Sequence, residues 1–180
     1  MPRAVDNARK ALISCTRKMV AKEGYSAFSM RNVAKECGMA PGTIYNYFHS
    51  KDDLIGACML EDWETASKNM HKTIEKKTGC MDVLETVYTT IRKFCDANSS
   101  VIQDSRACAN FRAHSKEYHV VILETVSGAI SSACEKYAVS FTPELVPFIA
   151  EDIIKYSVRG VDFKTFSAII APLFNTKKKN

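Results

Sequence analysis

Helix boundary signals stand close together in residues 29–54, and their spacing constrains the fold of this chain more than any other feature. Ser29 is a suitable N-cap for a short helix, which Gly38 closes. Pro41 fits the first turn of a further helix, predicted over residues 42–47, because its missing N–H is not needed there. The stretch therefore predicts two short helices joined by a tight glycine turn.

A packing helix precedes this pair and a longer helix follows it. The first helix is predicted to end at Gly24, and its core-facing stripe follows the helical period. Ser50, with Asp53 three residues later, forms a capping box that starts the longer helix. The stripe expected to face the core in the first helix consists of Ala8, Ala11, Leu12, Cys15 and Met19.

The same part of the chain carries the net positive charge. Residues 1–51 contain nine Lys and Arg against three Asp and Glu, 9 − 3 = +6, whereas residues 52–180 sum to 16 − 17 = −1. A basic lobe joined to a near-neutral body favours a polyanion as the partner of the lobe; a basic solvated surface is the alternative. Two short helices in such a lobe predict a helix-turn-helix, whose second helix enters the major groove of DNA.

The residues after the glycine turn are predicted to form two faces, one packed on the core and one directed at DNA. Ile44 and Phe48 lie four positions apart and are predicted to face the core. Tyr45 and Tyr47 offer hydroxyl groups that reach phosphate oxygens. Lys51 stands near the start of the next helix, where the helix dipole and the ammonium both favour an anion.

The stretch SMRNVAKECGMAPGTIYNYFHSKDDLI, residues 29–55, resembles the DNA-binding signature of TetR-type transcriptional regulators. There, Thr or Ser opens the second helix, Gly-Thr-Leu/Ile-Tyr forms the third, and Tyr-Phe-x-Ser/Asn-Lys leads into the fourth. One departure is Ala40, where relatives often have Ser. The resemblance implies that phosphates are contacted by Ser29, Thr43, Tyr45, Tyr47 and Lys51, and that base edges are approached by Pro41, Gly42, Thr43 and Asn46.

The remainder of the chain is predicted to be helical. A helix starts near Cys80, a shorter one follows over residues 102–111, and a long one over residues 116–137. The fold class expected is all-α, with a three-helix helix-turn-helix domain over residues 1–51. A helical effector-binding and dimerisation domain is expected over residues 52–180.

The helix that begins after Thr142 has two apolar stripes, more than one core needs. Pairing of two copies through the last two helices is therefore predicted; the resemblance implies the same, and burial within one subunit is the alternative. A homodimer also matches a two-fold operator in double-stranded DNA. The predicted interface residues are Val146, Ala150, Ile154, Val158, Phe166 and Ile170.

The resemblance also implies a pocket for a small-molecule effector in the body of the protein. The near-neutral charge of the body and its aromatic and sulfur-containing side chains agree with such a pocket, and a solid core is the alternative. A repressor that its effector releases from the operator is expected. The predicted lining residues are Trp63, Tyr88, Phe111, Tyr118 and Tyr156.

Enzymatic activity is not expected. His114 and His119 are five positions apart, which is not the i, i+4 spacing of a helical metal site, and no phosphate loop or nucleophile motif occurs. Neither a metal nor a cofactor is therefore predicted. No apolar run approaches the roughly 18 to 20 residues that span a bilayer, so a cytoplasmic protein with no membrane partner is expected.

The seven cysteines stand singly, without a C-x-x-C pair, as expected for small core residues in a reducing compartment. Cys15 lies beside Arg17 and Lys18, which could lower the pKa of its thiol. A cysteine-based redox-sensing DNA-binding regulator is therefore kept as the alternative function.

Overall fold

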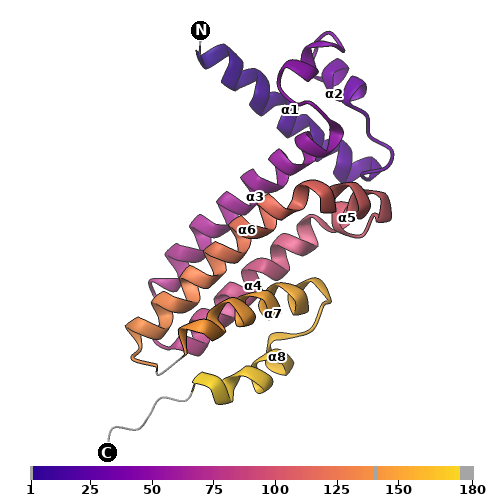
Figure 1. Cartoon of the computed structure of the whole chain (residues 1–180). Helices are drawn as coiled ribbons and strands as arrows, with labels where there is room; N and C mark the ends of the chain where they lie inside the picture. Colours follow the sequence, from indigo (N-terminus) through magenta and orange to yellow (C-terminus); the bar gives the residue numbers. More distant parts are fainter. Residues whose placement is uncertain (1, 140–141, 175–180) are drawn as a thin grey trace, which may run out of the picture. The chain divides into compact units, whose positions relative to one another are not determined.

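The computed structural model describes the backbone of residues 2–139 and 142–174, and the side chains of residues 7–104, 118–139 and 142–174. All regular elements in the described residues are helical, which confirms the all-α prediction (Figure 1). No described helix is long and apolar enough to span a bilayer. The elements are α1 (Pro2–Glu23), α2 (Met30–Glu36), η1 (Thr43–Asn46), α3 (Lys51–Ile74), α4 (Cys80–Ala97), α5 (Ser99–Ile102), α6 (Ser105–Lys136), η2 (Pro143–Leu145), α7 (Val146–Val158), α8 (Phe163–Ile170) and η3 (Ala171–Phe174), where η marks a 3₁₀ helix.

The chain forms two compact units. The first runs from the N-terminus to Asp62 and includes Asn98–Tyr118; the second comprises Trp63–Ala97 and the residues from His119 onward. The domain boundary expected after residue 51 thus falls inside the first unit. The chain passes from one unit to the other inside α3, between α4 and α5, and inside α6.

The N-terminal helix buries a face that is rotated from the expected one. Leu12, Ile13 and Thr16 are fully buried and Val20 nearly so, whereas Ala11 of the expected stripe is exposed. Thr16 fits this apolar face because its hydroxyl donates a hydrogen bond of 2.8 Å to the Leu12 carbonyl. The apolar residues of α1 allow either rotation, and packing against α2 selects one of them.

The turn between α2 and η1 depends on Gly38, which has a φ of +68°. A side chain in this left-handed conformation is strained, although a Cβ at Gly38 would meet no atom within 4 Å. Gly38→Ala should therefore lower the free energy of unfolding by about 1 kcal/mol. Gly42→Ala is the matched control, because Gly42 has a φ of −76° and equally open surroundings. Thermal unfolding of both variants measures the difference, and equal stability would contradict the conformational argument.

One long helix replaces the two expected over residues 102–111 and 116–137. α5 ends at Ile102, and α6 then continues without interruption from Ser105 to Lys136. The first 23 residues of α6 contain neither Gly nor Pro, so nothing in the sequence breaks the helix.

The second unit is built around α4. The apolar stripe of α4 is buried, and Figure 1 shows α7 lying alongside α4. Tyr88 of α4 packs against Phe163 and Phe166 of α8, with ring centroids 5.5 and 5.0 Å away. The buried stripe residues are Val83, Leu84, Val87, Ile91 and Phe94.

Candidate nucleic-acid interface

The helix-turn-helix segment forms at the predicted place, with one difference in its second helix. The Ser29 hydroxyl caps α2 by accepting a hydrogen bond of 3.2 Å from the Asn32 N–H. The helix expected over residues 42–47 is instead the 3₁₀ helix η1, in which the Tyr47 N–H donates to the Ile44 carbonyl. A 3₁₀ turn closes with fewer residues than an α turn, which suits this short connection before α3.

The residues of η1 and its flanks divide into a buried and an exposed face. Ile44 is 0% and Phe48 1% exposed, as predicted for core residues. Tyr45, which lies between these two residues in sequence, is 47% exposed. Of the other proposed DNA contacts, Pro41, Gly42 and Asn46 are exposed, and Ser29, Thr43, Tyr47 and Lys51 are half-buried.

Ser50 caps α3 as predicted, but the return hydrogen bond of the capping box comes from the residue before Ser50. The Ser50 hydroxyl accepts a hydrogen bond of 3.0 Å from the Asp53 N–H. The Asp53 carboxylate accepts one of 2.9 Å from the His49 N–H, one residue before the cap itself. These two bonds fix the chain that connects η1 to α3.

Lys51 lies in surroundings that its position in the sequence did not reveal. Its ammonium nitrogen is 4.3 Å from the ring centroid of Tyr25 and 4.4 Å from that of Phe28. Burial lowers the pKa of Lys51, an effect that the charges of Asp52 and Asp104 oppose. The Tyr25 hydroxyl in turn donates to the Asp52 carboxylate. No periodic pattern signals this aromatic site, because both rings come from the loop between α1 and α2.

Two of the basic residues of the first unit are engaged in ion pairs. Arg17 lies 2.7 Å from Asp62 and 3.3 Å from Glu61, and Arg9 lies 3.2 Å from Glu61. These pairs join α1 to α3 within the first unit. Several other bases remain exposed around the helix-turn-helix, namely Lys10, Lys18, Lys22, Arg31 and Lys35.

Cys15 does not have the lowered pKa that a redox sensor requires. Burial, together with the neighbouring Cys37 thiol, raises the pKa of Cys15 from 9.0 to about 11. Lys18 acts in the opposite direction but is the weakest of the causes. Because the thiolate is the reactive form, this environment makes Cys15 less reactive at neutral pH than a free cysteine.

The residues predicted for an effector pocket do not line one described cavity. Trp63 and Tyr88 are each 2% exposed and belong to the core of the second unit. The Tyr88 hydroxyl donates to the Val161 carbonyl at 2.8 Å, and Tyr156 packs on Phe166. Tyr118 belongs to the first unit, and the side chain of Phe111 lies outside the described residues.

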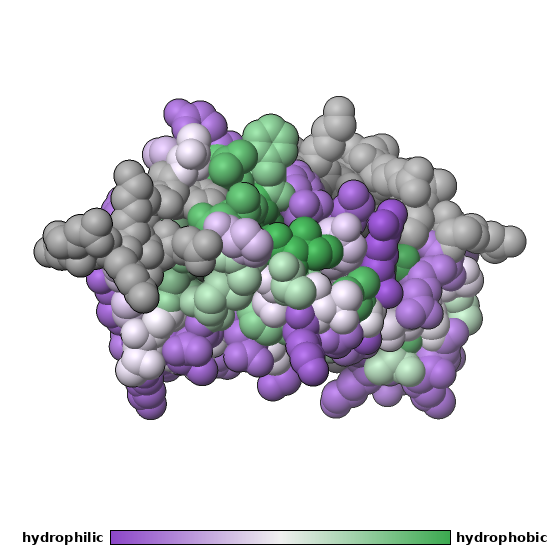
Figure 2. Space-filling model, turned by 90° about the horizontal axis from the view of Figure 1, so that it is seen from below, coloured by the Kyte–Doolittle hydropathy of each residue, from purple (hydrophilic) through white to green (hydrophobic). Residues whose placement is uncertain are grey.

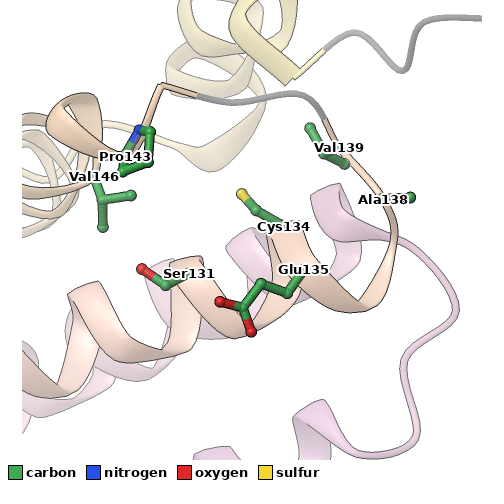
Figure 3. Close-up of a pocket in the computed structure, with 7 residues that line it drawn as sticks. All are labelled: Ser131, Cys134, Glu135, Ala138, Val139, Pro143 and Val146. Atoms are coloured by element: carbon green, nitrogen blue, oxygen red, sulfur yellow. The ribbon is translucent and has the colours of Figure 1, made fainter.

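A pocket of about 300 Å³ is present elsewhere in the second unit (Figure 3). One side of it comes from the end of α6 and the residues that follow, the other from η2 and the start of α7. None of the five predicted residues contributes to it. Its lining consists of Ser131, Cys134, Glu135, Ala138, Val139, Pro143 and Val146.

The predicted dimer residues are likewise divided by burial. Val146, Ala150, Phe166 and Ile170 are at most 6% exposed in the single chain, so they belong to its own core and offer little surface to a second copy. Ile154 is half-buried and Val158 is 50% exposed. Apolar side chains also gather on the surface seen in Figure 2. The large exposed apolar residues of α7, α8 and η3 are Phe148, Val158, Ile169 and Leu173.

Known proteins resemble this chain both in the sequence of the helix-turn-helix and in the fold. The family of bacterial regulatory proteins of the tetR type matches residues 12–58. The HTH-type transcriptional regulator UidR of Escherichia coli K12 is 25% identical over 135 residues, which cover 73% of this chain and 69% of that protein.

Solved structures extend the similarity over almost the whole chain. A putative TetR-family transcriptional regulator from Rhodococcus sp. superposes with a TM-score of 0.68 at 16% identity, covering 94% of this chain and 100% of that one. The regulator FadR from Bacillus subtilis, solved in complex with stearoyl-CoA, has a TM-score of 0.60 at 18% identity, covering 94% and 99%. The chain therefore carries the helix-turn-helix DNA-binding domain of the tetR family over residues 12–58, and the whole chain has the all-helical fold of these solved regulators.

Proposed function

We propose that this regulator is a repressor that binds a two-fold operator as a homodimer and leaves it when a small molecule binds the second unit. The two-sided structure of η1 carries the DNA-binding half of this proposal. Ile44 and Phe48 fix η1 on the core, and Tyr45 and Asn46 are thereby held outward on a short, slender element. A rigidly seated element with an exposed polar face is suited to the major groove.

Individual roles follow from chemistry and exposure. The phenol of Tyr45 and the amide of Asn46 are accessible, so we assign the first to a phosphate and the second to a base edge. The Ser29 hydroxyl accepts a bond from Asn32 and keeps its own hydrogen for a phosphate oxygen. Thr43, Tyr47 and Lys51 are assigned to phosphates, and Pro41, Gly42 and Thr43 to the close approach of the backbone to the bases.

Two substitutions separate base contacts from phosphate contacts. Asn46→Ala should weaken binding to the operator by about 1–3 kcal/mol, roughly 5- to 150-fold, and leave random duplex DNA nearly unaffected. Lys51→Ala should weaken binding to both DNAs and lower the slope of log affinity against log salt by about one. Salt titrations of both variants on fragments selected from genomic DNA measure these effects. Lys164→Ala, which removes an exposed charge from α8, is the matched control.

If Asn46→Ala lowered the affinity for operator and random DNA equally, the amide would not read bases. If Lys51→Ala behaved like Lys164→Ala, Lys51 would not contact phosphate.

We place the dimer interface on the exposed apolar residues of α7, α8 and η3. Phe148 is 70% and Ile169 62% exposed, and Val158 and Leu173 are exposed to about half of their surface. Large apolar side chains left exposed on a protein surface mark interaction sites when they lie together. A symmetric pair of such surfaces would bury them and give the regulator the two-fold symmetry of its operator.

The effector site is assigned to the second unit. Trp63 supports this assignment: its indole N–H is buried and has no hydrogen-bond partner among the described residues, so it can donate to an effector that offers an acceptor oxygen. The complex of FadR with stearoyl-CoA is a precedent for a small ligand in this fold. Since Trp63 is the only tryptophan, its fluorescence reports on binding.

A screen of small molecules should yield one that both shifts the Trp63 emission and releases operator DNA. Linkage requires that a molecule which weakens DNA binding tenfold binds the DNA complex tenfold more weakly than the free protein. If every molecule that bound the protein left its DNA affinity unchanged, the effector would drop out of the proposal. A dimer that binds DNA constitutively would remain.

A further inference from the structure

A segment from the middle of the chain is built into the DNA-binding unit. Asn98–Tyr118 follows α4 in sequence but packs with the N-terminal residues in the first compact unit. The Ser26 hydroxyl donates to the Asp104 carboxylate at 2.5 Å, joining the loop after α1 to the residue just before α6.

The same segment meets α3 near its start. A Cβ at Gly56 would clash with the phenol of Tyr118, so glycine allows this side chain to lie close to α3. Asp104 and Tyr118 thus hold the first half of α6 to the first unit at two separate places.

Asp104 also brings negative charge to the proposed phosphate contact. Its carboxylate accepts the hydrogen bond of Ser26, the residue next to Tyr25, and the Lys51 ammonium lies 4.3 Å from the centroid of the Tyr25 ring. The negative charge of Asp104 accordingly acts to raise the pKa of Lys51. A carboxylate at this place attracts the ammonium away from a DNA phosphate and repels the phosphate itself. Either effect weakens the binding of DNA.

We propose that Asp104 sets the DNA affinity of this regulator by competing with a DNA phosphate for the Lys51 ammonium. The inference rests on the proposed function only through the assignment of Lys51 to phosphate. Ser26 positions the competing carboxylate. Asp104 directly precedes α6, which continues into the second unit.

Asp104→Asn removes the charge, and its amide oxygen can still accept the Ser26 hydrogen bond. We expect the affinity of the full chain for a random 25-base-pair duplex to rise about 3- to 10-fold, an effect of about one charge pair near the surface. Glu85→Gln is the matched control: it removes an exposed negative charge from α4 and should leave the affinity within about twofold of the wild type. Thermal unfolding verifies that each variant is folded, and Asp104→Ser is a second variant without the charge.

A double-mutant cycle identifies the partner of Asp104. In the Lys51→Ala background, Asp104→Asn should no longer raise the affinity, because the ammonium for which it competes is gone. An increase that persists in this background would overturn the competition, and so would an Asp104→Asn variant that binds no better than Glu85→Gln. Failure of the proposed function would give a different result, because the wild-type chain itself would then not bind the duplex at any salt concentration.

Discussion

Replacing Ile169 by glutamate should convert the dimer into a folded monomer, whereas the same replacement at Ile170 should unfold the protein. The two residues are neighbours in α8, but Ile169 is 62% and Ile170 4% exposed in the single chain. A carboxylate at position 169 stays solvated in the monomer and is desolvated only on pairing, so it opposes association. A carboxylate at position 170 would be unpaired in the core of the second unit and cost several kcal/mol.

Light scattering gives the mass of each variant, and circular dichroism during heating gives its stability. The wild type should have twice the mass of the 20.1 kDa chain, and Ile169→Glu the mass of one chain with a melting transition retained. Ile169→Glu that remained dimeric would move the interface away from α8. A wild type that was monomeric at micromolar concentration would remove the dimer altogether.

Replacing Phe48 by alanine should abolish DNA binding, although Phe48 itself is buried and does not contact DNA. The Phe48 side chain is 1% exposed, and the Arg9 guanidinium lies 5.3 Å from its ring centroid. Loss of a buried phenylalanine costs about 3–5 kcal/mol, enough to release η1 from the core of the first unit. Phe48→Leu, which keeps most of the volume, should cost less and retain binding.

Denaturant unfolding and DNA titration of both variants check this prediction together. If Phe48→Ala kept operator affinity within threefold of the wild type, the seating of η1 on Phe48 would not matter for recognition. If both variants lost binding while remaining as stable as the wild type, Phe48 would act at the DNA surface rather than in the core.

The elements that the sequence predicted best are those with local chemical signals. Ser29 and Ser50 cap their helices and Gly38 makes its turn, because a cap or a positive φ depends on the residue itself and its nearest neighbours. Ile44 and Phe48 could be assigned to the core for a similar reason. They are four positions apart, so in a short helical element they lie on the same face.

The faces of the longer helices could not be predicted in the same way. In α1 the apolar residues allow two rotations, and Ala11 was placed in the core although it is exposed. In α7 the sequence shows two apolar stripes, but nothing in their period tells which of the two the subunit itself covers. Val146 and Ala150 were therefore assigned to the dimer interface, whereas packing against the rest of the second unit buries them.

Contacts between residues distant in sequence were the hardest to predict. The Lys51 ammonium lies over the rings of Tyr25 and Phe28, and Ser26 donates a hydrogen bond to Asp104. Both contacts depend on the tertiary fold, which no local pattern in the sequence specifies. The predicted effector residues remain a prediction for the same reason, because aromatic composition says which side chains fill a core and not where a cavity remains.

The most direct test of DNA recognition by η1 is selection of genomic fragments by the wild-type chain and by Asn46→Ala in parallel. We expect the wild type to enrich an inverted repeat whose half-sites are centred about one helical turn apart, or a small multiple of it, and Asn46→Ala to lose or change the preference within each half-site. Enrichment of no sequence by the wild type, or of the same half-sites by both proteins, would contradict recognition of an operator through this element.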